Sequence, residues 1–143
     1  MRTGGMSLAI DVGGTKVIVA LVDDAGAVCA RVSMATRDLD AIPSASPVDG
    51  TGEQSTPADH LVQRIATAAA TLVRDTEVMP AGVGFATTGH VDAIAGTVLH
   101  SGLVPGWSGF ALREKVRRAL INAGLPELPV AVDNDGHAMA LAE

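Results

Sequence analysis

The stretch SLAIDVGGTKVIVALV, at residues 7–22, decides the fold predicted for this chain. It contains two short apolar runs, 7–12 and 16–22, and the second is rich in the β-branched residues that favour strands. Gly13 and Gly14 separate the two runs. A Gly-Gly pair in this position is typical of a tight hairpin, because the primed turns that join antiparallel strands require positive φ. The stretch therefore predicts two antiparallel strands joined by a glycine turn.

The next segment extends this hairpin. A second turn at residues 23–26 and an alternating run at 27–34 predict a third strand, and hence an antiparallel meander. Cys29 lies in this third strand, where we expect a small buried hydrophobe. Residues 37–56 then lack periodicity and are rich in Pro, Gly, Ser and Thr, which predicts a long loop that is mobile or close to a site.

The rest of the chain alternates helices with strands. Thr56 as the cap, Pro57 at the first helical position and Asp59 in the first turn predict the start of a helix. Apolar residues of this helix recur at spacings of three and four, at Leu61, Ile65, Ala68, Ala69, Leu72 and Val73. Strands are expected at 81–86, 97–100 and 128–132, and helices at 108–122 and from about Gly136. This order predicts an α/β fold in which a mixed sheet carries helices on its faces.

Composition narrows the functional classes. The chain has 143 residues, of which 48% are hydrophobic, and this suffices for one domain with a core. Its formal net charge of −6 argues against a nucleic-acid-binding face, which needs clustered positive charge. No apolar run approaches the roughly 20 residues of a membrane span, and we expect neither a signal peptide nor a membrane partner. A single cysteine forms no intramolecular disulfide, so we expect a cytoplasmic protein.

The first candidate for chemistry is the motif DVGGTK at residues 11–16. A Gly-Gly-Thr turn exposes consecutive backbone N–H groups with no Cβ in the way, so an anion such as a phosphate can approach closely. The Thr15 hydroxyl adds a donor, and Asp11, at the end of a strand, could hold Mg²⁺ directly or through its water shell. The alternative is a plain hairpin turn with a surface aspartate.

The second candidate is VDNDGH at residues 132–137, where an apolar strand gives way to a helix. Ligands of α/β folds favour this edge, outside the carboxyl ends of the strands. A carboxylate there can accept a proton from a substrate hydroxyl that attacks a phosphoryl group. Asn134 offers both a donor and an acceptor to neighbouring hydroxyls. The alternative is that Asn or Asp here caps the following helix.

A third candidate is the turn after the strand at 81–86, formed by Thr87, Thr88 and Gly89. Its backbone and hydroxyl groups could bind a polyol, and the alternative is an ordinary transition from strand to turn. The histidines lack the spacing of metal ligands, so we expect structural or surface roles for His60, His90, His100 and His137.

Together these motifs resemble the ROK family of sugar kinases and sugar-responsive repressors. LAIDVGGTKVIVALVDDAGAV resembles the family's opening phosphate motif, GVGFATTGHVDAIAGTVLHSGLVPGW its central segment, and PVAVDNDGHAMALAE its catalytic segment. The three matches follow the family's order across nearly the whole chain, and this order is more specific than any one motif. The Thr-Thr-Gly turn is closer to the N-acetylmannosamine kinase branch than to the commoner Pro-Gly form.

The resemblance implies the actin-like, ribonuclease-H-like ATPase fold, in which two α/β domains surround a cleft. Residues 1–143 would form the N-terminal domain. The implied activity is transfer of the γ-phosphoryl group of ATP, bound with Mg²⁺, to a hydroxyl of a hexose or N-acetylhexosamine such as glucose or N-acetylmannosamine. The implied partners are therefore a small-molecule sugar and ATP.

The resemblance also implies roles for individual residues. Asp135 would be the catalytic base that deprotonates the sugar hydroxyl, and Asn134 would hold an adjacent one. Asp11 would face the metal. The sugar would be bordered by Gly89, Thr88 and Thr87. The nucleotide phosphates would be faced by Gly13, Gly14, Thr15 and Lys16.

The chain also departs from the family's pattern. Leu103 stands where the family usually has an Asn sugar ligand, and the sequence ends before the family's E-x-G-H motif, zinc motif and adenosine-binding segment. We therefore expect a domain that is almost inactive alone and that self-associates, as a dimer, through apolar surface. The open alternatives are a non-catalytic sugar-binding or interaction module, and a sugar-responsive regulator without its DNA-binding domain.

Overall fold

The computed structural model describes residues 2–3, 5–37, 56–102 and 106–134. Its strands are β1 Arg2–Thr3, β2 Met6–Val12, β3 Lys16–Asp23, β4 Val28–Ala35, β5 Val78–Met79, β6 Val83–Thr87, β7 His90–Asp92, β8 Thr97–His100 and β9 Val130–Asn134. Its helices are α1 Pro57–Thr76 and α2 Leu112–Asn122. Most of the loop predicted at 37–56, and the helix predicted from about Gly136, lie outside the described residues.

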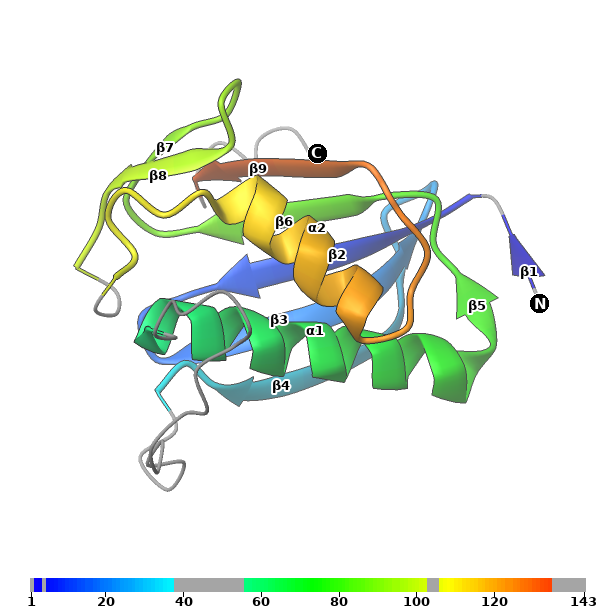
Figure 1. The fold of residues 1–143 in the computed structure, drawn as a ribbon. Coiled ribbons are helices and arrows are strands. Elements are labelled where there is room, and N and C mark those ends of the chain that lie inside the picture. The colour runs from blue at the N-terminus through cyan, green and yellow to red at the C-terminus, as the bar shows by residue number, and fades with distance from the viewer. Residues whose placement is uncertain (1, 4, 38–55, 103–105, 135–143) are drawn as a thin grey trace.

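Five of the strands form one sheet in the order β4-β3-β2-β6-β9 (Figure 1). β2, β3 and β4 are antiparallel neighbours, which confirms the predicted meander. β6 pairs parallel with β2, and β9 pairs parallel with β6. The sheet is therefore mixed, as predicted, and the carboxyl ends of β2, β6 and β9 lie at one edge of it.

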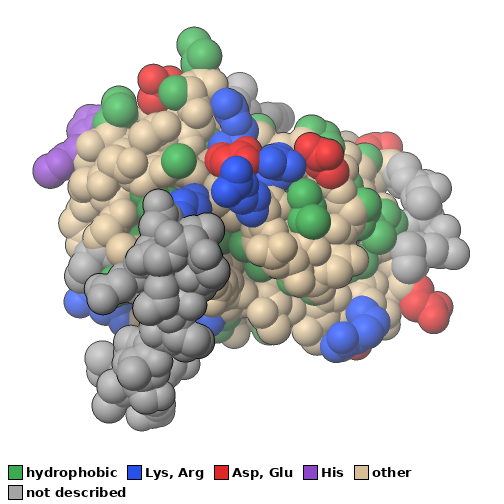
Figure 2. Space-filling model, viewed as in Figure 1, with side chains coloured by type: hydrophobic (Ala, Val, Ile, Leu, Met, Phe, Trp, Pro, Cys, Tyr) green, Lys and Arg blue, Asp and Glu red, His purple; other side chains and the backbone are tan. Residues whose placement is uncertain are grey.

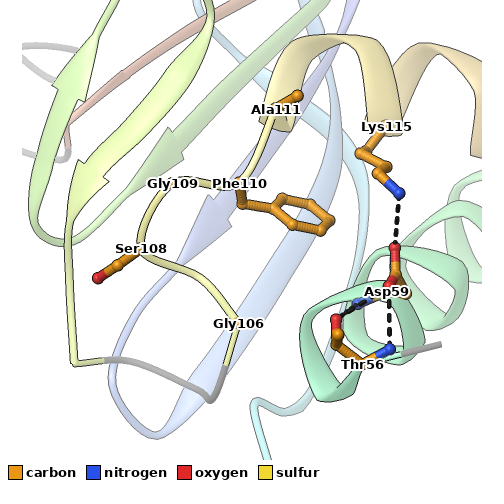
Figure 3. Close-up of a pocket in the computed structure, with 8 residues that line it drawn as sticks. All are labelled: Thr56, Asp59, Gly106, Ser108, Gly109, Phe110, Ala111 and Lys115. Atoms are coloured by element: carbon orange, nitrogen blue, oxygen red, sulfur yellow. Dashed lines mark hydrogen bonds and ion pairs between the residues drawn. The ribbon is translucent and has the colours of Figure 1, made fainter. Parts of the chain in front are cut away.

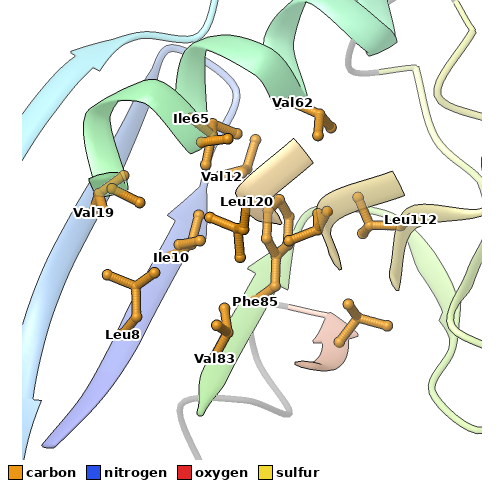
Figure 4. Packing of buried hydrophobic residues seen from close by; sticks show 14 of the residues in the cluster. Leu8, Ile10, Val12, Val19, Val62, Ile65, Val83, Phe85, Leu112 and Leu120 are labelled. Carbon is orange, nitrogen blue, oxygen red and sulfur yellow. The ribbon is translucent and has the colours of Figure 1, made fainter. Parts of the chain in front are cut away.

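Both helices lie on the same face of this sheet (Figure 1), with α1 against β3 and β4 and α2 against β9. Their apolar sides meet the inward side chains of the strands, as in the contact region of Ile10, Ile65 and Leu120 (Figure 4). These three side chains are at most 2% exposed. Burying a large aliphatic side chain stabilises a fold by about 1.5–3 kcal/mol, so each of these three residues contributes to holding the helices on the sheet.

Helix α1 begins as the sequence predicts. The Thr56 hydroxyl accepts a hydrogen bond from the Asp59 backbone N–H at 3.2 Å, and the Asp59 carboxylate accepts one from the Thr56 N–H at 2.9 Å. This reciprocal capping box satisfies two N–H groups that the helix itself leaves unpaired. Pro57 occupies the first helical position, where its missing N–H costs nothing.

The glycine turn (residues 13–16) joins β2 to β3, but its predicted conformation is wrong, because neither Gly13 nor Gly14 has positive φ. The Gly13 N–H donates to the Lys16 carbonyl at 2.9 Å. The Gly13 carbonyl accepts from the Thr36 hydroxyl at 2.8 Å. A side chain from beyond β4 thus completes the turn, which does not need the geometry of a primed turn.

Three further expectations need correction. The helix predicted at 108–122 begins only at Leu112, because Gly109 has a φ of 79° and Ser108 donates back to the Ser101 carbonyl at 2.9 Å. The predicted strands at 81–86 and 128–132 begin and end one or two residues later, as β6 and β9. Cys29 is exposed rather than buried, because β4 is an edge strand of the sheet.

Acidic and basic side chains interleave on the outer side of α2 (Figure 2). Glu114 accepts from Arg117 at 2.7 Å and from Arg118 at 2.9 Å, and Arg117 also reaches Glu127 at 3.0 Å. The Arg117 hydrogen bond, with help from Arg118, lowers the pKa of Glu114 to about 2. Such exposed pairs add little to stability. Among the described residues, no helix has both the length and the apolar character that crossing a bilayer takes.

Candidate functional site

Three parallel strands end together at one edge of the sheet. The register pairs Val12 of β2 with Thr87 of β6, and Thr87 with Asn134 of β9. Neighbouring strands lie about 4.8 Å apart, so the ends of β2 and β9 are roughly 10 Å from each other. The glycine turn leaves this edge after Val12, and the chain continues from the same edge after Asn134. The structure therefore brings one described residue of each predicted motif, Val12, Thr87 and Asn134, to the same edge.

The glycine turn presents backbone donors at this edge. Within the described part of the chain, the N–H groups of Gly14 and Thr15 have no hydrogen-bond partner, and both residues are exposed. A Cβ placed on Gly14 would meet nothing within 4 Å. Consecutive N–H groups with open space above them form a site that an anion can enter. The turn thus fits the phosphate groups of a nucleotide.

Thr36 is a site residue that the sequence analysis missed. It is 2% exposed, and its hydroxyl and its N–H donate to the carbonyls of Gly13 and Thr15 at 2.8 and 3.0 Å. The predicted meander could have pointed to Thr36. In such a meander the residue that follows the third strand lies beside the turn that joins the first strand to the second. The turn is thus supported from beneath by a buried polar side chain.

Asp11 faces away from the helices. Along β2 its side chain alternates with the buried Ile10 and Val12, and it is exposed. The register places it in one cross-strand row with Ala86 and Asp133, so two carboxylates lie on this face about 10 Å apart by strand spacing. Mg²⁺ is commonly held by one or two carboxylates, substrate phosphates and water. An exposed Asp11 beside the glycine turn fits that pattern.

Thr87 is fully buried, and its hydroxyl accepts a hydrogen bond from the Trp107 indole N–H at 3.2 Å. Trp107 is itself 0% exposed and stacks on Phe110, with ring centroids 5.4 Å apart. The Thr87 hydroxyl thus joins the end of β6 to the segment before α2. In the same turn, Thr88 is half-buried and Gly89 is exposed.

Gly89 cannot be replaced without movement of its surroundings. Its φ is 100°, and a Cβ there would lie 2.6 Å from the His100 carbonyl oxygen and 2.7 Å from Cβ of Ser101. The glycine therefore lets β6 turn into β7 directly against the end of β8. The turn at residues 87–89, which is predicted to border a sugar, therefore lies directly against residues 100–101.

Of the second motif, Val132, Asp133 and Asn134 lie among the described residues. Asn134 is half-buried, and its N–H donates to the Asp133 carboxylate at 2.8 Å. Asp135, the predicted base, and Leu103, the departure from the family's Asn, both lie outside the described residues. Their roles stay predictions.

A pocket of about 550 Å³ opens between the first turns of α1 and α2 (Figure 3). The Lys115 ammonium reaches the Asp59 carboxylate at 3.1 Å and lies 5.6 Å from the centre of the Phe110 ring. Burial works to raise the pKa of Asp59, but hydrogen bonds from Thr56 and Lys115 outweigh it and hold the pKa below its ordinary value. The pocket is lined by Thr56, Asp59, Gly106, Ser108, Gly109, Phe110, Ala111 and Lys115. Thr56 was predicted only as a helix cap and Asp59 only as a first-turn residue, so this pocket was not predicted.

The sequence pattern of the ROK family matches residues 7–143. An N-acetylmannosamine kinase of Yersinia pestis (strain Pestoides F) is 29% identical over 139 residues, which cover 97% of this chain and 39% of that protein. The chain thus spans about two fifths of the length of this curated relative.

Solved structures show the same fold. A ROK family glucokinase from Streptomyces griseus, in complex with glucose and AMPPNP, aligns with a TM-score of 0.67 and 27% identity over 95% of this chain and 35% of that one. A ROK hexokinase from Thermus thermophilus aligns with a TM-score of 0.69 and 24% identity over 95% and 37% of the two chains. These likenesses confirm the predicted α/β class and the actin-like, ribonuclease-H-like ATPase fold.

Proposed function

The chain belongs to the ROK family, and from this premise we propose that it is the N-terminal domain of a sugar kinase. The reaction would transfer the γ-phosphoryl group of ATP to a hydroxyl of a hexose or N-acetylhexosamine. The observation that carries the proposal is the common edge at which Val12, Thr87 and Asn134 end their strands. A donor phosphate held at one of these ends and a sugar held at the next would lie within reach of each other.

On the nucleotide side, the proposal uses the glycine turn. The N–H groups of Gly14 and Thr15, which have no partner among the described residues, would donate to phosphate oxygens, and the exposed Lys16 would add positive charge. Asp11 would hold Mg²⁺, directly or through water. The metal would neutralise part of the phosphate charge when bound. Gly13 would keep the backbone of β2 close to the bound phosphates.

On the sugar side, the proposal uses the ends of β6 and β9. Asp135 would accept the proton of the attacking sugar hydroxyl, whose oxygen forms a new bond to the γ-phosphorus while the bond to the β–γ bridging oxygen breaks and ADP leaves. Asn134 would hold a neighbouring hydroxyl. Thr88 and Gly89 would border the sugar. The Thr87 side chain, which was also predicted to border it, is fully buried, so Thr87 would instead support the turn through its bond to Trp107.

The chain covers 39% of its kinase relative, and we infer that catalysis would need a second domain. The reaction depends on positioning and on charge stabilisation, and both require the far wall of a cleft. We therefore expect residues 1–143 alone to show almost no turnover. The predicted dimer is tested by light scattering, and a strictly monomeric chain would contradict it.

The test of the proposal is Asp135→Asn in a two-domain protein that contains this chain. Removal of the base should lower kcat by a factor of roughly 10² or more while sugar affinity, measured by calorimetry with glucose and N-acetylmannosamine, changes little. Asp75→Asn is the control, because it removes an exposed carboxylate near the C-terminal end of α1, away from this edge. Undiminished turnover in Asp135→Asn would exclude the base role. Sugar binding without any phosphoryl transfer in the unmodified protein would favour a non-catalytic sugar-binding module.

A further inference from the structure

Thr36 ties the glycine turn to the end of β4. It is one of two polar or charged residues, with Thr87, that are buried in the described part of the chain. Buried polar groups are normally hydrogen-bonded, and Thr36 spends both of its donors on the turn. Its hydroxyl donates to the Gly13 carbonyl at 2.8 Å, and its N–H donates to the Thr15 carbonyl at 3.0 Å.

These bonds set the direction of the outward donors. In a trans peptide the C=O and the next N–H point in opposite directions. The Gly13 carbonyl points inward to Thr36, so the N–H of Gly14, in the same peptide unit, must point outward. Loss of the Thr36 hydroxyl would leave this peptide free to rotate, because Gly13 and Gly14 have no side chains to hinder it.

Arg64 holds Thr36 in turn. From the middle of α1 its guanidinium donates to the Thr36 carbonyl at 3.2 Å and to the Ala35 carbonyl at 2.5 Å. Hydrogen bonds from a charged donor are stronger than neutral ones, and the planar guanidinium fixes both carbonyls at once. A continuous set of contacts therefore runs from α1 through the end of β4 to the glycine turn.

We propose that Thr36 and Arg64 are positioning residues for the nucleotide, which hold the glycine turn with its Gly14 N–H directed at the phosphates. This inference rests on the proposed function, since it assigns a ligand to those donors. Neither residue touches the ligand. Thr36 acts through the Gly13 peptide, and Arg64 acts through Thr36.

The experiment compares Thr36→Val, which keeps the branched shape and removes the hydroxyl, with Thr36→Ser, which keeps the hydroxyl. Amide hydrogen exchange at Gly13, whose N–H donates to the Lys16 carbonyl across the turn, reports the turn in the chain itself. Steady-state kinetics of a two-domain protein that contains the chain report KM for ATP and for the sugar. Thr36→Val should speed the exchange and raise KM for ATP about tenfold, with KM for the sugar unchanged, and Thr36→Ser should restore both.

Two matched controls exclude a general loss of stability. Thr67→Val removes a hydroxyl that donates to the Gln63 carbonyl at 3.0 Å on the exposed side of α1, away from the turn. Arg74→Met is the control for Arg64→Met, because it removes an exposed arginine of the same helix. Both controls should leave the turn exchange and KM for ATP unchanged, whereas Arg64→Met should change both in the same direction as Thr36→Val.

The outcomes separate this inference from the proposed function. If Thr36→Val leaves exchange at Gly13 and KM for ATP as they were, or raises both KM values equally, the positioning role is overturned. If the unmodified two-domain protein neither binds AMPPNP nor uses ATP, the proposed function fails, and with it the nucleotide role of the two residues. Faster exchange in Thr36→Val would then still show that Thr36 holds the turn.

Discussion

The indole N–H of Trp107 donates to the Thr87 hydroxyl across 3.2 Å, and both side chains are fully buried. The bond joins the end of β6, at the proposed active edge, to the segment that leads into α2. Since these residues are 20 positions apart in the chain, the contact exists only in the folded structure. It links the geometry of the site to the stability of the domain.

Replacement of Thr87 by Val should therefore destabilise the fold. The change keeps the volume but leaves a buried indole N–H without its acceptor, which costs about 1–3 kcal/mol. Thr76→Val on α1 removes a half-buried hydroxyl that donates to the Leu72 carbonyl at 2.7 Å, strands no buried donor, and should cost less. Urea unfolding followed by tryptophan fluorescence measures the free energy of unfolding of both variants. Equal decreases would show that the Trp107–Thr87 hydrogen bond contributes no more to stability than the Thr76 hydroxyl does.

Gly89→Ala should displace the end of β8. The new Cβ would lie 2.6 Å from the His100 carbonyl, at a φ of 100° that L-residues rarely adopt. We expect a loss of about 2 kcal/mol in the free energy of unfolding, from the backbone conformation and the contact together. Gly84→Ala in β6 is the control, since its Cβ would meet nothing within 4 Å. A Gly89→Ala protein as stable as Gly84→Ala would contradict the close approach.

Gly14→Ala separates nucleotide binding from stability. Its Cβ would contact nothing within 4 Å, and Gly14 has no positive φ, so the free energy of unfolding should change by less than about 0.5 kcal/mol. The methyl group would stand where a phosphate must approach, so the affinity of a two-domain protein that contains this chain for AMPPNP should fall about tenfold in calorimetry. Gly26→Ala, in the turn between β3 and β4, is remote from the site and should leave AMPPNP affinity unchanged. Unimpaired binding in Gly14→Ala would place the phosphates elsewhere.

The Asp59 carboxylate should make stability depend on pH on the acid side. Its pKa in the folded protein is below the ordinary value of 3.8, against burial, because Thr56 and Lys115 donate to the charged form. The stabilisation is therefore complete above pH 3.8 and is lost as the pH falls through the lowered pKa. At neutral pH, Asp59→Asn should cost about 1 kcal/mol, and the difference from the unmodified protein should shrink in acid. Asp75→Asn, which removes an exposed carboxylate of the same helix, is the control and should cost less at neutral pH in urea unfolding.

Much of the fold was predictable, because its signals are local. Alternation of apolar residues indicates the meander, and Thr56 with Pro57 marks the start of α1 within a few positions of sequence. The start of α2 was predicted four residues too early, at Ser108 instead of Leu112, because spacing alone does not reveal that Gly109 turns the chain. The exposure of Cys29 depends on which strand lies at the edge of the sheet, and this is a property of strand order.

Local sequence patterns were enough to predict the α/β class of the fold, the three motifs and the chemistry that their residue types favour. Three relationships could be read only from the folded chain: Val12 and Asn134 end at one edge, Thr36 reaches back to Gly13, and Lys115 meets Asp59. The difference lies in sequence separation. Periodicity, caps and turn residues act over a few positions, whereas these contacts join segments 23 to more than 100 residues apart and form when the strands pair and the helices cover them.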